Sequence, residues 1–198
     1  MPKPQPWRYD TDMATQTKND IFLQPDSIIA ELGVTAGMQV GDFGVGGAAN
    51  FAVPLATKAG ANGQVFMVDI LKTALSSALG LIKLRGLSNC QAVWSNLEIY
   101  GAAHGIGDAS LDTGVLVNVL SQSTKPKDIL AEVHRTLKSG AKLLIVDWLP
   151  SAAMPIAPDP ARRLAPDYVT ELGKKLGYAP LKEFSAGRYH WGLILIRT

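Results

Sequence analysis

A carboxylate followed closely by glycines marks the segment Met38–Ala56, "MQVGDFGVGGAANFAVPLA". An apolar run reaches Asp42, and Gly44, Gly46 and Gly47 follow. Glycine adopts positive φ without strain and lets a ligand approach the backbone closely. In open α/β sheets, ligands lie beyond the carboxyl ends of the strands, where the first turn meets a helix N-terminus. The segment therefore either cradles a cofactor or only packs a strand tightly against the next helix.

Two cofactors are compatible with this loop. Gly44-x-Gly46-x-x-Ala49 satisfies the dinucleotide-binding fingerprint, which tolerates alanine at its third position. The alternative is S-adenosylmethionine. Asp69 ends the next apolar run and accepts hydrogen bonds from the ribose hydroxyls of either cofactor. Asp42 discriminates between them, because a dinucleotide loop does not use a carboxylate before its first glycine, whereas the ammonium group of S-adenosylmethionine attracts one.

The order and spacing of four segments resemble the class I S-adenosylmethionine-dependent methyltransferases. The first two are "VGDFGVGGAANFAVPLA", similar to the family's glycine-rich motif, and "GQVFMVDI", similar to the strand that ends in the ribose-binding acid. "VWSNLE" resembles the segment after the third strand, and residues 111–148 resemble the region from the fourth to the fifth strand. The similarity covers residues 25–197. It departs from the family at Ala48, where a third glycine is usual, and at Asn96, where aspartate is usual.

The resemblance implies S-adenosylmethionine as the cofactor, with S-adenosylhomocysteine as its product, and a set of residues that bind it. The glycine loop and its carboxylate would hold the methionine end, and Asp69 the ribose. Ile70 and Leu97 would flank the adenine, and Asn96 would accept a hydrogen bond from its amino group. Asn118 either faces the methionine and the acceptor or only caps the fourth strand. The full expected set is Asp42, Phe43, Gly44, Val45, Gly46, Asp69, Ile70, Asn96, Leu97 and Asn118.

No catalytic triad, dyad or metal-ligand cluster is visible, and no catalytic residue is assigned. Methyl transfer from a sulfonium is a direct displacement, so the protein must chiefly position the acceptor, and a base is needed only for a protonated acceptor. Asp147 is either such a base or a capping carboxylate. The segment around Asn118 lacks the Asn/Asp-Pro-Pro-Tyr/Phe tetrapeptide of family members that methylate adenine or glutamine, which disfavours those substrates.

Three variable segments border the expected cleft. They are the arm before residue 25, residues 121–126 and residues 148–163. The arm contains Trp7, Arg8 and Tyr9, and it either covers the cofactor as a lid or only anchors to the surface.

Five further residues near the cleft each have a functional and a structural interpretation. Arg162 and Arg163 either bind an anionic acceptor or are solvated. Tyr189, His190 and Trp191 begin the last strand, where alternation puts Tyr189 and Trp191 on one face and His190 on the other. For these three we expect a role in the core or on the sheet.

Alternating strands and helices must bring these residues together. Strand patterns cover residues 37–44, 63–70, 89–95, 111–120 and 141–148, and helical patterns cover residues 25–34, 48–60, 71–86, 125–140 and 164–178. Residues 179–198 hold two further strands that must pair as a hairpin, since a parallel connection needs a dozen or more residues. The order predicts a Rossmann-like, doubly wound α/β fold. Its seven-stranded sheet is mostly parallel, with an antiparallel C-terminal hairpin and helices on both faces.

Composition indicates a single domain. The chain has 198 residues, with a domain expected over residues 25–198 after an irregular arm over residues 1–24. The single cysteine, Cys90, excludes an intramolecular disulfide and favours a reducing cytoplasm. The three histidines are far apart, so we expect no metal site. The net charge is +2 without a basic stripe, so nucleic acid is not implied.

We expect a cytoplasmic protein that acts on a small molecule. The sequence has no run long enough to span a membrane, and its first residues lack the apolar core of a signal peptide. The chain lacks a large substrate domain, which favours a small acceptor, while a protein or RNA acceptor and the oligomeric state stay open. The alternatives are a non-catalytic cofactor-binding or interaction module on the same fold, and an NAD(P)-dependent oxidoreductase.

Overall fold

The alternating strand and helix patterns build one sheet in the computed structural model, which describes residues 23–198. The sheet has seven strands in the order β3-β2-β1-β4-β5-β7-β6. The strands are β1 Gln39–Phe43, β2 Gln64–Asp69, β3 Cys90–Trp94, β4 Leu111–Val117, β5 Leu137–Trp148, β6 Tyr178–Gly187 and β7 His190–Arg197. The helices are α1 Pro25–Ala30, α2 Ala52–Ala59, α3 Lys72–Leu84, α4 Pro126–Thr136, α5 Pro166–Lys174, and the short 3-10 helices η2 Leu120–Gln122 and η3 Pro160–Arg162.

Only β7 runs against the other strands. Strands β1 to β5 pair in parallel, whereas β7 pairs antiparallel with both β5 and β6. The turn between β6 and β7 is too short for a crossover, so these two strands form a hairpin that adds to the edge of β5. The predicted seven-stranded, mostly parallel sheet with a C-terminal hairpin is confirmed.

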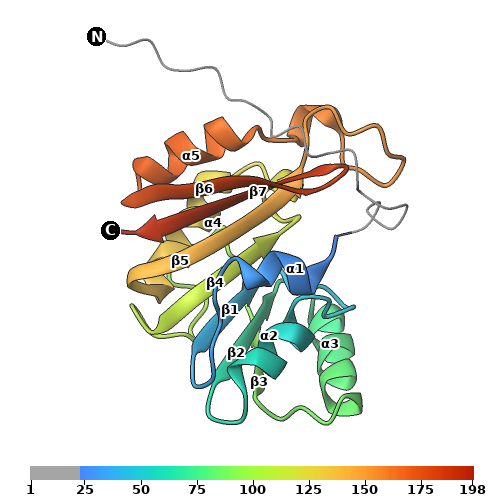
Figure 1. Cartoon of the computed structure of the whole chain (residues 1–198), viewed down its shortest axis with the longest axis vertical. Helices are drawn as coiled ribbons and strands as arrows, with labels where there is room; N and C mark the ends of the chain where they lie inside the picture. The colour runs from blue at the N-terminus through green and yellow to red at the C-terminus, as the bar shows by residue number, and fades with distance from the viewer. Residues whose placement is uncertain (1–22) are drawn as a thin grey trace.

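Helices cover both faces of the sheet, with α1 and α2 in front and α4 behind in the view of Figure 1. Leu55 of α2 and Leu75 of α3 lie in one core together with Val115 of β4. Leu130 of α4 lies in the other core together with Leu116 of β4. Alternation along β4 sends neighbouring side chains to opposite cores. The doubly wound arrangement is therefore confirmed, and the loops that could form a site gather at the ends of the strands.

Several helix boundaries differ from the sequence prediction: α1 ends at Ala30 and α5 at Lys174, both earlier than predicted, and two further cases have a visible cause. Helix α2 begins at Ala52, later than predicted, because the chain first makes a turn in which Ala49 has a φ of +49°. Helix α4 ends at Thr136, and the prediction that the helical pattern over residues 125–140 continues through Leu137 was wrong. Leu137 instead begins β5 and pairs with Leu111. In both places a backbone contact outside the helix outweighs the local apolar pattern.

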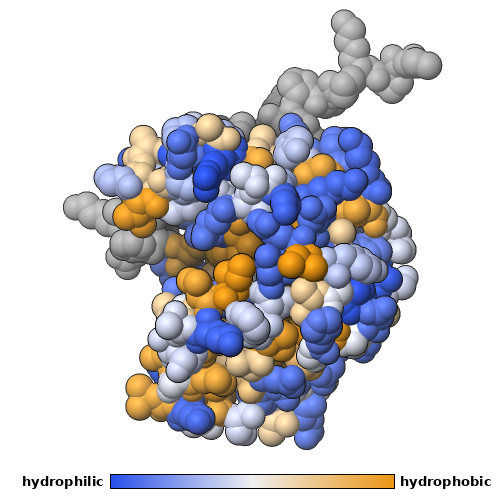
Figure 2. All heavy atoms as spheres, turned by 180° about the vertical axis from the view of Figure 1, so that it is seen from behind, coloured by the Kyte–Doolittle hydropathy of each residue, from blue (hydrophilic) through white to orange (hydrophobic). Residues whose placement is uncertain are grey.

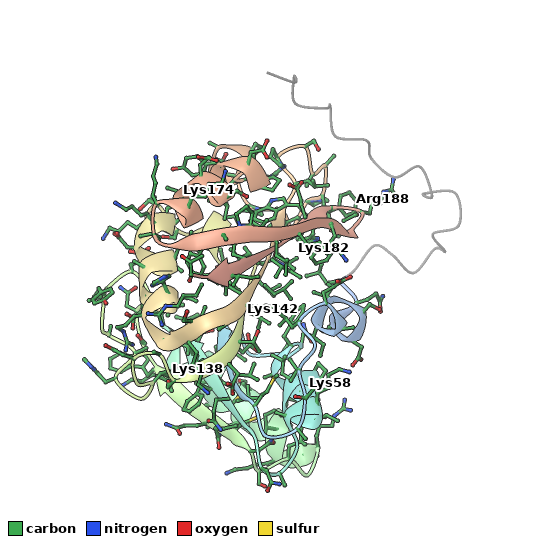
Figure 3. The ribbon with its side chains drawn as sticks, turned by 60° about the vertical axis from the view of Figure 1, so that its left-hand side comes forward. Lys58, Lys138, Lys142, Lys174, Lys182 and Arg188 are labelled. Atoms are coloured by element: carbon green, nitrogen blue, oxygen red, sulfur yellow. The ribbon has the colours of Figure 1, made fainter. Side chains whose placement is uncertain are left out.

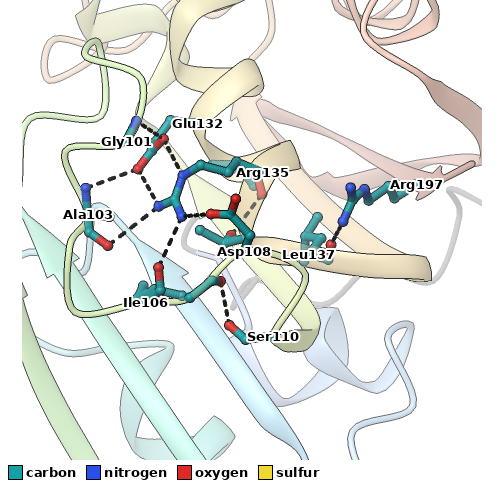
Figure 4. A network of polar contacts seen from close by, with 12 residues as sticks. Gly101, Ala103, Ile106, Asp108, Ser110, Glu132, Arg135, Leu137 and Arg197 are labelled. Atoms are coloured by element: carbon teal, nitrogen blue, oxygen red, sulfur yellow. Dashed lines mark hydrogen bonds and ion pairs between the residues drawn. The ribbon is translucent and has the colours of Figure 1, made fainter.

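The connection from β3 to β4, residues 95–110, contains no helix and is fastened to α4. Glu132 of α4 is fully buried and accepts hydrogen bonds from two backbone N–H groups of this loop, at 2.6 and 3.0 Å. Arg135 forms ion pairs with Glu132 at 2.8 Å and with Asp108 at 2.5 Å (Figure 4). Charge-assisted hydrogen bonds of this kind are strong, so they hold the loop in one place without a helix.

Within residues 23–198, no helix combines the length and the apolar composition that a bilayer-spanning segment needs. The predictions for Trp7, Arg8 and Tyr9 lie outside the described residues.

Candidate functional site

The turn after β1 requires glycine at its first position. Gly44 has a φ of +85° and donates its N–H to the carbonyl of Val68 at 2.8 Å. A Cβ atom on Gly44 would lie 2.3 Å from Cγ2 of Val119. Gly46 has a φ of +63°, but no atom lies within 4 Å of its Cβ position. The loop therefore packs tightly at Gly44 and presents bare backbone on an open side at Gly46.

The carboxylate of Asp69, at the end of β2, fixes this loop. Its Oδ2 accepts a hydrogen bond from the N–H of Gly46 at 3.0 Å, and its Oδ1 accepts one from the N–H of Leu71 at 2.9 Å. Each carboxylate oxygen has a further lone pair, so Asp69 keeps the capacity to accept hydrogen bonds from ligand hydroxyls. The geometry thus brings the glycine loop and the end of β2 into direct contact.

Asp42 lies on β1, just before the loop, and is 2% exposed. Its Oδ2 finds no hydrogen-bond partner in the part of the chain that the structure describes. Burial first, and then the charge of Asp69, raise the pKa of the Asp42 carboxyl to about 7. A buried carboxylate oxygen without a partner is rare, and a cationic group bound beside it would supply the missing interaction.

The predicted adenine segment follows β3 and lies beside the end of β2. Ser95 donates its N–H to the carbonyl of Asp69 at 3.1 Å, which holds Asn96 near this strand end. The amide oxygen of Asn96 accepts the N–H of Glu98 at 2.9 Å, so one of its two acceptor positions is in use. Ile70 is 55% exposed, so its side chain is accessible to a ligand at this strand end.

Three predicted site residues place their side chains in the cores. Phe43 is fully buried and Leu97 is 7% exposed in the core under α4 and α5, while Val45 is 8% exposed in the opposite core. These residues would contact a cofactor chiefly through their backbone. Ala48, which replaces the usual third glycine, is exposed and does not adopt positive φ, so its methyl group causes no strain.

Asn118 follows β4 in a left-handed conformation, with a φ of +55°. Its N–H donates to the carbonyl of Val146 at 2.8 Å, and its Oδ1 is buried without a partner among the described residues. The next residue, Val119, is the one that excludes a side chain at Gly44. Asn118 therefore borders the glycine loop, and strained backbone of this kind is concentrated at functional sites.

Two other polar candidates already have structural partners. Asp147 is 1% exposed and accepts the backbone N–H groups of Ser121 at 3.0 Å and Trp148 at 2.8 Å, so it caps the strand end. Burial raises the pKa of its carboxyl. Arg163 donates to three backbone carbonyls of residues 150–158 and thereby holds its own loop together. Arg162 remains exposed.

The carboxyl ends of the strands border a hollow in the surface. Figure 2 shows this hollow toward the left of the view, lined largely by apolar residues. It lies on the side toward which β4 and β5 run in Figure 1. The glycine loop, Asp69, Asn96 and Asn118 all belong to segments that begin at this edge of the sheet.

Comparison with known proteins decides between the two cofactors. A family model described as a methyltransferase domain matches residues 35–163, well over half of the chain. The chain belongs to this methyltransferase family. It is a class I S-adenosylmethionine-dependent methyltransferase, and S-adenosylmethionine rather than a dinucleotide is its cofactor.

Solved structures share the fold of this methyltransferase. An S-adenosylmethionine-dependent methyltransferase from Aquifex aeolicus is 22% identical, with 89% of this chain and 90% of that one covered and a TM-score of 0.79. The [4+2]-cyclase SpnF is 14% identical, with 87% and 79% covered and a TM-score of 0.73. An arsenic(III) S-adenosylmethionine methyltransferase from Chlamydomonas reinhardtii is 19% identical, with 83% and 64% covered and a TM-score of 0.66. No curated protein matches the sequence.

The residues of this methyltransferase fit its cofactor. Asp42 offers an unpartnered carboxylate oxygen, Gly46 leaves open space beside the backbone, and Asp69 keeps acceptor capacity. Residues 23–198 contain no group of His, Cys, Asp or Glu side chains arranged to hold a metal ion.

Sequence reasoning missed several contacts at the site. Ser123 donates to Glu98 at 2.6 Å and so joins the loops that follow β3 and β4. Val119 sets the shape of the glycine turn, yet an apolar residue after a strand carries no such signal. The three-residue spacing of Glu132 and Arg135 could have indicated a helical ion pair. The contacts of this pair with the loop between β3 and β4 join residues far apart in the sequence, so no local pattern predicts them.

Proposed function

We propose that the ten residues predicted from the sequence bind S-adenosylmethionine and that the enzyme methylates a small-molecule acceptor. The observation that carries the proposal is the buried Asp42 carboxylate, whose Oδ2 has no partner among residues 23–198 and which lies beside a glycine loop that Asp69 holds in place. A cationic amino acid moiety next to Asp42 and ribose hydroxyls next to Asp69 would satisfy these groups.

Each group has a definite task in this proposal. When bound, S-adenosylmethionine supplies an electrophilic methyl group. Asp42 forms an ion pair with the ammonium group, and Asp69 accepts hydrogen bonds from the ribose hydroxyls. Asn96 accepts a hydrogen bond from the adenine amino group at the acceptor position of its amide oxygen that Glu98 does not use. Asn118 marks the side from which an acceptor must approach. The protein then contributes by orienting the two molecules and excluding water.

The distribution of basic residues supports a small acceptor over a nucleic acid. Figure 3 labels six basic residues, of which Lys138 and Lys142 lie on β5 and the other four in separate segments of the described chain. Three of them are paired with carboxylates at 2.6 to 2.8 Å: Lys138 with Asp112, Lys174 with Glu171, and Lys182 with Glu31. Because these charges are already compensated, they contribute little to a polyanion-binding surface.

A thermal-shift and calorimetric titration tests the cofactor site. Ligand at 100 times its dissociation constant stabilises a protein by about 2.7 kcal/mol, which corresponds to about 5–10 °C here. S-adenosylmethionine and S-adenosylhomocysteine should give this rise, and NAD and NADP should not. Asp69→Ala should weaken S-adenosylhomocysteine binding by about 1.5–3 kcal/mol. Asp167→Ala, at an exposed position on α5, is the control and should not.

The acceptor class needs a second test. We would incubate the enzyme with methyl-labelled S-adenosylmethionine and a cell extract separated into small-molecule, protein and RNA fractions. Label in the small-molecule fraction supports the proposal, and label confined to protein or RNA contradicts its second half. Cofactor binding without transfer to any fraction would favour a non-catalytic module on this fold.

A further inference from the structure

Under the proposed function, on which this inference rests, the strand order gives the order in which the parts of the cofactor lie along the sheet. The proposed cofactor contacts follow one edge of the sheet: Asn96 after β3, Asp69 on β2, Asp42 on β1 and Asn118 after β4. Adenine lies at one end of this row and the methionine moiety at the other. The next strands in the sheet are β5 and β7. Their ends at the same edge are therefore where an acceptor would be bound.

Two rings occupy these strand ends. Trp148 is the last residue of β5, His190 is the first of β7, and the two are partners in the antiparallel register. Their ring centroids are 4.1 Å apart, with an angle of 40° between the planes. Trp148 is 7% exposed and His190 is 5% exposed. The pair thus forms a nearly buried aromatic surface beside the proposed methyl-donor end.

Trp191 fixes the backbone that carries this pair. Its side chain lies in the core under α4 and α5, and its Nε1 donates to the carbonyls of Trp148 at 3.1 Å and Leu164 at 2.9 Å. Alternation puts the neighbouring His190 on the opposite face, as the sequence predicted. The imidazole is therefore held by its stacking partner and by a backbone that cannot easily shift.

The Nε2 atom of His190 is buried and has no hydrogen-bond partner among residues 23–198. Burial lowers the pKa of His190 to about 4, so the imidazole is neutral near pH 7. A buried nitrogen without a partner costs free energy unless a ligand or water completes it. His134 has the same unpartnered Nε2, but it stacks edge-on against Tyr178 at the opposite edge of the sheet, so it serves as a matched control.

The surrounding groups indicate what kind of molecule fits. Asp147 and Arg163 are both engaged by backbone groups, so their hydrogen-bonding capacity is largely used within the protein. Asn118, whose Oδ1 is buried without a partner among the described residues, follows β4, and β5 separates β4 from β7 in the sheet. An uncharged molecule with a flat apolar body and a hydroxyl group suits this surface, because a hydroxyl can both donate and accept.

We propose that His190, held against Trp148, binds the methyl acceptor through a hydrogen bond at Nε2, and that the acceptor is a neutral hydroxylated aromatic molecule. His190 is a binding residue in this proposal and takes no part in bond making. Nε2 is covered in the state described, so the side chains over it must move when the acceptor enters, while the ring pair and its backbone stay in place; rotamer changes of this kind are common on binding.

The test uses three matched probes on the full chain loaded with S-adenosylhomocysteine: phenol, toluene, which lacks the hydroxyl, and benzoate, which is anionic. The protein is labelled with ¹³C at histidine Cε1, and the signals are assigned with His190→Phe and His134→Phe. Phenol should shift the His190 signal saturably and leave the His134 signal in place. Toluene and benzoate should shift it much less. His190→Phe keeps a ring and should weaken phenol binding roughly fivefold, as expected for one hydrogen bond, whereas His134→Phe should not.

The outcomes separate this inference from the proposed function. Loss of S-adenosylhomocysteine binding by the wild-type protein contradicts the proposed function itself. Normal cofactor binding without any phenol-induced shift of His190 overturns only the inference. It is also overturned if benzoate binds as well as phenol, or if His190→Phe binds phenol as the wild type does.

Discussion

At the scale of single residues, Asp42 should make cofactor affinity depend on pH. Its carboxyl has a pKa of about 7 because it is buried and lies near Asp69. An ammonium group binds the ionised form, so below this pKa binding must first remove a proton. The dissociation constant should therefore fall as pH rises through 7 and then level off. Between about pH 6 and about pH 7.5 the ionised fraction rises roughly eightfold, and calorimetry with S-adenosylhomocysteine should show a similar change.

Asp42→Asn is the control for this pH dependence. The amide has nearly the same size but does not titrate, so the variant should bind S-adenosylhomocysteine more weakly and without the wild-type slope. A wild-type profile that matches the variant's would mean that the carboxylate does not contact the ammonium group.

Substitution by alanine should have different effects at Gly44 and at Gly46, the two glycines of the loop with positive φ. Gly44→Ala combines positive φ with a clash against Val119, so it should destabilise the fold by more than about 2 kcal/mol in urea denaturation. Gly46→Ala has open space and only backbone strain, which costs about 1 kcal/mol. Its larger effect should be on S-adenosylhomocysteine binding. If Gly46→Ala bound the cofactor normally, the open side of the loop would not be where the cofactor lies.

At the scale of elements, one buried carboxylate, that of Glu132, holds the helix-free loop between β3 and β4 in place. Glu132 accepts hydrogen bonds from this loop and from Arg135, and these contacts hold the pKa of Glu132 below its usual value despite burial. Glu132→Gln leaves the guanidinium of Arg135 without its buried partner, so it should cost about 3 kcal/mol in urea denaturation at neutral pH. Because the pKa is lowered, the contribution of Glu132 is present at neutral pH and lost on acidification.

Glu171→Gln is the matched control for this prediction. Glu171 also pairs with a residue three positions further on, Lys174, but both side chains are largely exposed. Because solvent screens an exposed pair, removing it should leave the free energy of unfolding nearly unchanged. Equal effects of the two substitutions would mean that burial of the Glu132 network contributes nothing to stability.

The sequence could predict elements better than their ends. Continuous or alternating apolar patterns predicted β1 to β5, and the short connection in residues 179–198 required the hairpin, since both signals are local. The end of α4 was missed because Leu137 pairs with Leu111, a contact between distant residues that no helical period contains. The same limit applies to the site. Asp42, Gly44 and Asp69 stand in a recognisable order, whereas Val119 and the pair of Trp148 and His190 enter only through sheet topology.

At the scale of the whole molecule, the sheet gathers segments that are far apart in the sequence along one edge. The order β3-β2-β1-β4-β5-β7 puts the proposed adenine, ribose, methionine and acceptor regions in succession. Asp69 touches the glycine loop directly, and Ser123 reaches Glu98 between the loops after β4 and β3. A single ligand along this edge would therefore contact several separate loops at once.

Amide hydrogen exchange should reveal this arrangement. Binding of S-adenosylhomocysteine should slow exchange together in residues 44–46, 69–71, 95–98 and 118–123, because one ligand restricts all four loops. The turns at the opposite edge, such as residues 61–63 and 86–88, should exchange at the same rate with and without the ligand. Protection limited to residues 44–46 would contradict the proposed adenine end of the site. Equal protection at both edges would indicate general stabilisation by the ligand instead of contact along the carboxyl ends of the strands.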